Sequence, residues 1–149
     1  MNIAGIINDA VNGYDGVAIE IYVSGCTHGC KGCHNPEMQS FNYGEPLDML
    51  KLIQYSTDQE QWYDIISILG GDLLCSHEDE AKKLGWTLKL GFPQKKLWLF
   101  TGAEHKDIPQ WCYEVFDVIK YGRYIEELRD ESYELATTNQ CYIRKGCDY

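Results

Sequence analysis

The sequence lacks the features that would place a protein in a membrane, outside the cell or on nucleic acid. No run of apolar residues is long enough to cross a bilayer. Residues 1–10 contain no basic segment followed by an apolar stretch, so we expect no secretory signal. Basic residues are few, 13 against 23 acidic ones, and the resulting net charge of −10 argues against binding to phosphate backbones. We therefore expect a cytoplasmic protein with no membrane or nucleic-acid partner.

Internal repeats and low-complexity linkers are also absent. A chain of 149 residues, 44% of them hydrophobic, is long enough to bury one core, so we expect a single domain over residues 1–149. The seven cysteines are an odd and uneven set, unlike the even, dispersed cysteines of a secreted disulfide scaffold. Reduced thiols are therefore expected.

Hydrophobic periodicity predicts strands that alternate with helices. We expect the first strand over 17–23, further strands over 64–69, 96–100 and 115–120, an edge strand over 141–144, and helices over 46–55, 77–90 and 108–115. This alternation is typical of βαβ units and predicts an α/β fold with a mostly parallel sheet.

Short polar or glycine-rich segments follow each of the expected strands. They are a cysteine-rich loop over 26–33, Gly70-Gly71-Asp72, Thr101-Gly102 and Gly122-Arg123. Because ligands bind beyond the carboxyl ends of parallel strands, we expect these segments to share one edge of the sheet.

The cysteine loop has the spacing C-x3-C-x2-C, formed by Cys26, Cys30 and Cys33. Each of these residues directly follows a glycine: Gly25, Gly29 and Gly32. Glycine can adopt positive φ, which lets three side chains converge from a short segment. An iron–sulfur cubane normally has four cysteine ligands, so three would leave one iron open to another ligand.

A structural zinc site is the alternative for these cysteines, with His28 or His34 as the fourth ligand. Against it, zinc sites favour paired C-x2-C units, and the loop has only one. The other cysteines fit no ligand motif. Cys112 lies in an apolar helical segment and is expected in the core; Cys75, Cys141 and Cys147 have no assigned role, although the last two could pair or bind a metal.

The C-x3-C-x2-C loop resembles the cluster motif of radical S-adenosylmethionine (SAM) enzymes. Residues 30–37, CKGCHNPE, are similar to the loop of the activating proteins of glycyl-radical enzymes. Segments elsewhere resemble the activating proteins of anaerobic ribonucleotide reductase: 9–13, 97–102, 121–124, 128–130 and 138–140. The chain departs from that family where Asn12-Gly13 is not followed by a Gly-Pro-Gly turn, and where Tyr121 replaces an acidic residue.

The resemblance implies a small radical SAM fold, a partial open βα barrel, with one [4Fe–4S] cluster on Cys26, Cys30 and Cys33. It also implies that SAM binds the open iron and is cleaved reductively to generate a glycyl radical on the large subunit of anaerobic ribonucleotide reductase. A low-potential donor such as flavodoxin or ferredoxin would supply the electron.

The resemblance further assigns the SAM contacts. The residues it places around SAM are Gly70, Gly71, Asp72, Thr101, Gly102, His34 and Asn35. Among them, Asp72 and the Gly70-Gly71 backbone would accept hydrogen bonds from the SAM ammonium group. No side chain beyond the cluster and SAM is expected to be catalytic.

Three other functions remain open from the sequence. The protein could activate a different glycyl-radical enzyme, of the formate-lyase type, or it could be a small radical SAM enzyme acting on a small molecule. It could also be a binding module without enzyme activity, stabilised by zinc.

Overall fold

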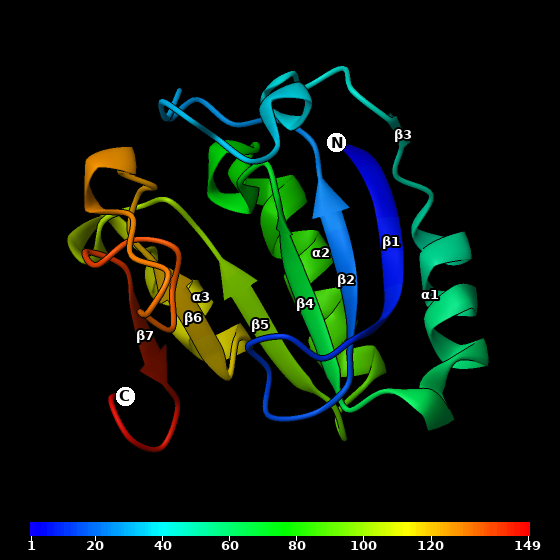
Figure 1. Ribbon diagram of the computed structural model, residues 1–149. Coiled ribbons are helices and arrows are strands. Elements are labelled where there is room, and N and C mark those ends of the chain that lie inside the picture. The colour runs from blue at the N-terminus through cyan, green and yellow to red at the C-terminus, as the bar shows by residue number, and fades with distance from the viewer.

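The computed structural model describes residues 1–149, and one seven-stranded sheet runs through the chain (Figure 1). The strands are β1 Asn2–Ala10, β2 Ala18–Val23, β3 Glu45–Pro46, β4 Ile65–Gly70, β5 Lys96–Phe100, β6 Val118–Tyr121 and β7 Cys141–Arg144. The α-helices are α1 Met49–Asp58, α2 Glu78–Gly91 and α3 Gln110–Val115. No helix in the structure is both long and apolar enough to span a membrane.

The sheet has a parallel centre and antiparallel margins. Its strand order is β3-β1-β2-β4-β5-β6-β7, and β2, β4, β5 and β6 pair in parallel. The strands β1 and β7 run antiparallel to β2 and β6, and the two-residue β3 pairs antiparallel with β1 at the edge. The predicted α/β class is therefore confirmed, with the parallel part confined to the four central strands.

The helices cover one face of this sheet, where most of the apolar side chains are buried. In Figure 1, α2 and α3 lie behind the central strands. The alternation of β2 turns Ile19 and Ile21 toward the helices, where they join a core of 21 buried residues that includes Leu84, Leu88 and Phe116. This packing supplies most of the apolar burial that stabilises the fold.

The opposite face of the sheet, which we call the open face, carries no helix. Its buried cluster contains only Ala18, Ile65, Trp98 and Val118. The segment over residues 11–17 crosses in front of it (Figure 1). From this segment the ring of Tyr14 packs edge-on against Trp98, with 5.0 Å between ring centroids.

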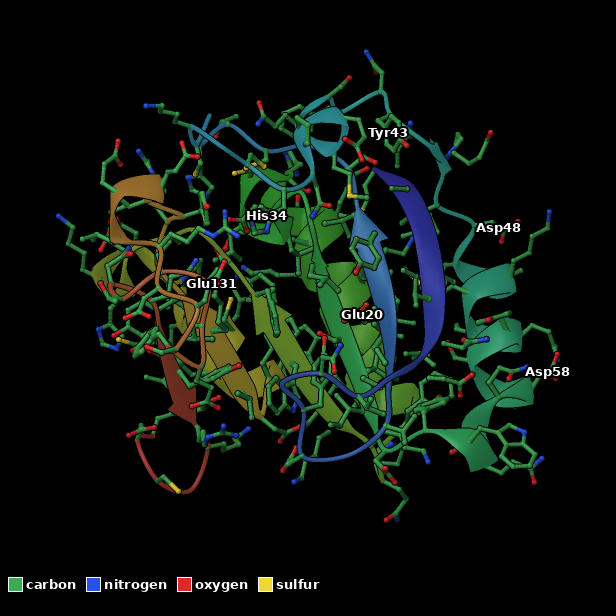
Figure 2. The ribbon with its side chains drawn as sticks, viewed as in Figure 1. Glu20, His34, Tyr43, Asp48, Asp58 and Glu131 are labelled. Carbon is green, nitrogen blue, oxygen red and sulfur yellow. The ribbon has the colours of Figure 1, made fainter.

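Polar groups also lie on the open face beside this cluster. Glu20, labelled in Figure 2, accepts hydrogen bonds of 2.8 Å from the hydroxyls of Tyr14 and Tyr22. The Tyr14 hydroxyl also lies 2.9 Å from Oγ of the buried Ser67. Burial raises the pKa of Tyr14, so this hydroxyl stays protonated and donates.

The strand predicted over residues 17–23 is confirmed as β2, but it is not the first strand, because β1 precedes it. The β1 segment alternates poorly: its pairing with β2 is interrupted between Ile3 and Gly5 and between Ile7 and Ala10, and Asp9 has a φ of 59°. Its side chains are only half-buried or exposed, so the apolar pattern that identifies an inner strand is weak here.

Other boundaries also differ from the predictions: α2 and β4 begin and end one residue later than expected, and α3 begins two residues later. The largest differences are at α1 and β6. The helix expected from residue 46 begins at Met49, because the Asp48 side chain caps it by accepting a hydrogen bond of 3.1 Å from the Lys51 amide. The strand expected from residue 115 begins at Val118. Asp117 precedes it, and its carboxylate accepts a hydrogen bond of 2.8 Å from the Leu97 amide of β5.

Candidate iron–sulfur and ligand site

A cleft of about 460 Å³ lies at the carboxyl ends of the parallel strands. Its walls come from the loop after β2, from the ends of β4, β5 and β6, and from the C-terminal segment. All ten residues predicted as cluster ligands or SAM contacts line it: Cys26, Cys30, Cys33, His34, Asn35, Gly70, Gly71, Asp72, Thr101 and Gly102. The strand-end segments thus share one edge of the sheet, as the parallel topology requires.

Backbone hydrogen bonds hold the cysteine loop above the sheet. The Gly25 amide donates to the Met38 carbonyl at 2.7 Å, and the Cys26 amide donates to the Gln39 carbonyl at 3.1 Å. Met38 and Gln39 belong to a 3₁₀ turn over Pro36–Gln39, so the loop folds back on its own start. In Figure 1 it lies beyond the carboxyl ends of β2 and β4.

The glycines within this loop have the backbone conformation that their sequence positions suggested. Gly29 has a φ of 61° and Gly32 a φ of 75°, both in the left-handed region that favours glycine. These turns reverse the chain between the three cysteines, so that all three thiols reach the same cleft.

The two glycines after β4 are needed because the backbone passes directly against the cysteine loop. A Cβ on Gly71 would lie 2.6 Å from the Gly25 carbonyl oxygen, and one on Gly70 would lie 2.9 Å from that of Val23. Across this approach the Asp72 amide donates to the Gly25 carbonyl at 2.9 Å. The end of β4 and the cysteine loop are therefore fixed to each other through their main chains.

Asp72 forms hydrogen bonds through its carboxylate with several segments of the cleft wall. Its side chain is 1% exposed, and Oδ2 accepts hydrogen bonds from the Thr101 hydroxyl and the Gly102 amide, both at 2.8 Å. The same oxygen lies 2.7 Å from Nε2 of His28, and Oδ1 accepts from the Leu74 amide at 3.0 Å. This carboxylate thus connects the ends of β4 and β5 to the cysteine loop.

A fourth thiol lies close to the cysteine motif. The ligand atoms of Cys26, His28 and Cys75 all lie within 4.8 Å of one another. A hydrogen bond from the Cys26 thiol lowers the pKa of Cys75 to about 6, and the same contact raises the pKa of Cys26. The hydrogen bond with Asp72 raises the pKa of His28.

Cys75 differs from the three cysteines of the motif, Cys26, Cys30 and Cys33, because it does not line the cleft. It ends the 3₁₀ turn Leu73–Cys75, and its sulfur accepts hydrogen bonds from the amide and hydroxyl of Thr27, at 3.5 and 3.4 Å. Sequence reasoning left Cys75 without a role because its proximity to Cys26 depends on the tertiary contact between two loops.

The histidines of the loop have different surroundings. His28 packs over Gly102, where an added Cβ would lie 2.7 Å from the ring. His34 is exposed at the rim, with its ring 5.0 Å from that of Tyr124, and Figure 2 shows it beyond the ends of the central strands. His28 is therefore fixed by Asp72, while His34 remains accessible to a ligand in the cleft.

Lys120 is a cleft residue that the sequence analysis did not identify. It lies near the end of β6 and lines the cleft, and none of the ion pairs or side-chain hydrogen bonds of the structure includes its amine. Burial lowers the pKa of Lys120 to about 8. The sequence did contain a sign of this role, because a lysine that ends a largely apolar strand is expected to have a partly buried amine, and such perturbed groups are frequent in functional sites.

The C-terminal segment closes one side of the cleft. Glu134, Leu135, Ala136 and Gln140 line it, and the Gln140 amide group donates to the Gly122 carbonyl at 3.1 Å. Arg123, in contrast, is exposed and does not line the cleft.

The remaining cysteines lie away from the cleft. Cys112 is fully buried in α3, as predicted for a core residue. Cys141 and Cys147 are both exposed and unpaired, so the structure contains no disulfide between them.

Comparison with known proteins adds to this geometry. The family model described as "4Fe-4S single cluster domain" matches residues 11–143. The chain is 30% identical over 135 residues to the anaerobic ribonucleoside-triphosphate reductase-activating protein of Enterobacteria phage T4, a match that covers 89% of this chain and 86% of the phage protein.

Bacterial proteins of the same name are similar to the chain to the same degree. The protein of Escherichia coli K12 is 30% identical over 131 residues, covering 83% of this chain and 84% of its own length. That of Vibrio cholerae is 32% identical over 133 residues, covering 85% of each. No solved structure matches significantly. The chain therefore belongs to the 4Fe–4S single-cluster family, among the anaerobic ribonucleoside-triphosphate reductase-activating proteins.

Proposed function

We propose that this protein is a radical SAM activating enzyme that generates a glycyl radical on the large subunit of anaerobic ribonucleotide reductase. The observation that carries the proposal is that the three cysteines of the C-x3-C-x2-C motif line one cleft together with Gly70-Gly71-Asp72. The names of the relatives support the choice of protein substrate. An electron donor such as flavodoxin or ferredoxin belongs to the same proposal.

The donor set of the cleft fits a cluster with three protein ligands. Cys26, Cys30 and Cys33 would hold it, since these are the only thiols that line the cleft. Cys75 does not line the cleft, so we do not count it among the cluster ligands. When bound, the cluster supplies the electron that splits SAM into methionine and a 5′-deoxyadenosyl radical, which takes a hydrogen atom from the α-carbon of the substrate glycine.

The protein's own residues would bind and orient SAM. The volume of about 460 Å³ is in the range of small-molecule sites. We place the SAM ammonium group at the Gly70-Gly71 backbone and Asp72, with Thr101 and Gly102 holding the carboxylate of Asp72 in position. The amine of Lys120, which has no acidic partner, would then bind the carboxylate of SAM.

The open face of the sheet would admit the protein substrate. We interpret the parallel strands β2, β4, β5 and β6 as a partial, open barrel, with helices only on its outer side. A glycine-bearing loop of the reductase would enter from the open face and exclude water from the cleft, which limits side reactions of the radical.

The central experiment is anaerobic reconstitution with iron and sulfide, followed by dithionite and SAM. We expect iron and acid-labile sulfide in the protein, 5′-deoxyadenosine as a product, and a glycyl-radical EPR signal when the reductase is added. The variant Cys30→Ser should lose all three, while Cys141→Ser, which changes an exposed thiol outside the cleft, should lose none.

Two outcomes would contradict the proposal. Zinc without sulfide would favour a metal-stabilised binding module, for which Cys26, His28 and Cys75 are the nearest donor group. A full radical signal on a reductase that lacks its radical-bearing glycine would refute the assigned acceptor. Activation of a formate-lyase-type enzyme in place of the reductase would change the partner but retain the chemistry.

A further inference from the structure

We propose that Cys26 and Cys75 form a reversible disulfide when the protein carries no cluster, and that this disulfide withdraws one cluster ligand under oxidising conditions. The observation is the juxtaposition of two thiols from different loops, whose ligand atoms lie within the same 4.8 Å group. The proposal gives Cys75 a role that cluster binding and SAM binding do not require.

The surroundings of the two thiols favour this pair. Cys75 is fixed, because its sulfur accepts two hydrogen bonds from Thr27, the residue directly after Cys26. The two loops are also held together by the hydrogen bond from the Asp72 amide to the Gly25 carbonyl. Cys30 and Cys33 lie outside the close group, so Cys75 is the best-placed partner of Cys26.

Both thiols are partly exposed, so either can meet a small disulfide such as oxidised glutathione. One of them attacks, as its thiolate, one sulfur of oxidised glutathione, and one glutathione leaves as its thiol. The other cysteine then attacks the sulfur of the first and releases the second glutathione. Two electrons pass from the two cysteines to oxidised glutathione, and the two protons leave with the glutathione products.

The consequence for the cluster rests on the proposed function, since it requires Cys26 to be a cluster ligand. A disulfide at Cys26 leaves only Cys30 and Cys33 in the cleft, too few to hold a cluster. A dithiol reductant would restore the ligand. The pair would thus keep oxidised protein in a recoverable form and protect Cys26 from irreversible oxidation.

The test uses the full chain, purified without metal, reduced and then incubated with oxidised glutathione. After alkylation, wild-type protein should have lost two of its seven thiols and two hydrogens in mass, without retaining glutathione. Trypsin should yield residues 1–31 joined to residues 52–82, a peptide in which Cys75 is the only cysteine. Fragmentation should place the bond at Cys26 and not at Cys30.

The variant Cys75→Ser should show no such cross-link, whereas the matched variant Cys141→Ser should keep it. A Cys26–Cys30 or Cys30–Cys33 bond as the main product, or a stable glutathione adduct on Cys26, would overturn the proposal. Iron and sulfide uptake, measured separately, should fall in the oxidised wild type and recover with dithiothreitol. If the reduced protein takes up no cluster, the proposed function fails; the cross-link itself is judged by the peptide map alone.

Discussion

The two faces of the sheet differ in what they bury. The helical face contains a continuous apolar core, while the open face contains a four-residue cluster next to Glu20, Ser67 and the amine of Lys120. The cleft lies beyond the carboxyl ends of the strands, outside both of these buried clusters. Stability and chemistry are thus placed in different parts of the molecule, and mutations should separate them.

The largest effect on stability is expected for Leu84→Ala on the helical face. Leu84 is fully buried in α2, and its truncation removes apolar contacts and leaves a cavity, which should cost about 2–5 kcal/mol. Chemical denaturation followed by circular dichroism measures this loss. The fraction of the variant that is folded should still bind iron and sulfide. Failure to bind them would show that packing on the helical face also determines the geometry of the cleft.

Asp72→Ala should affect both stability and the cleft. It leaves the hydrogen-bond donors of Thr101, Gly102 and Leu74 without their acceptor, at a cost of about 1–3 kcal/mol for a buried group. We expect SAM affinity to fall more than cluster loading, because Asp72 is not one of the three thiols. Calorimetric titration of reconstituted protein with SAM tests this, and equal affinity in variant and wild type would remove the ligand role of Asp72.

Lys120→Met should weaken SAM binding by about ten- to hundredfold, since a charge-assisted hydrogen bond contributes about 1.5–3 kcal/mol. Lys120→Arg is the matched control that keeps the charge. If both variants bind SAM as tightly as wild type, the amine does not contact the ligand.

The same residue predicts a pH dependence of stability. The pKa of Lys120 is about 8 in the folded protein and about 10.4 in an unfolded chain. The unfolded state therefore binds more protons between these values, and wild type should gain stability relative to Lys120→Met as the pH rises from about 8 to about 10. Parallel denaturation curves over this range measure the difference, and a constant difference would contradict the lowered pKa.

The smallest effect is expected for Tyr14→Phe on the open face. The change removes one hydroxyl that donates to Glu20 but keeps the ring against Trp98, so we expect a loss of about 0.5–1.5 kcal/mol. Thermal unfolding with Tyr43→Phe, an exposed tyrosine, as control would measure it. A loss as large as that of Leu84→Ala would mean that the open face stabilises the fold as much as the core does.

Local sequence patterns predicted the parts of the molecule that depend on neighbouring residues. The strand over 96–100 and the edge strand over 141–144 have the predicted bounds, and α2 begins one residue after the predicted start because His77 caps it. Convergence of the strand-end segments followed from parallel topology alone. In contrast, β1 escaped prediction because an outer strand need not alternate strictly.

The missed parts of the site depend on tertiary contacts. Cys75 follows Cys26 by 49 positions, and tertiary contacts such as the close approach of Gly71 to Gly25 bring their loops together. Lys120 was placed at a strand end without a role, because its significance lies in the absence of an acidic partner. Tyr14, which follows Asn12-Gly13, packs on Trp98 and donates to Glu20, and these contacts also depend on the tertiary fold.

The main-chain hydrogen bonds that fix the cysteine loop bear on which positions of the protein can vary in evolution. The bonds at Gly25, Cys26 and Asp72 run from amide to carbonyl, so they do not depend on which side chains occupy the rim. Rim positions such as His34 and Glu134 can therefore be exchanged without loosening the frame beneath them. A lineage could acquire a new protein target by altering its rim, and inherit the main-chain frame of the pocket unchanged.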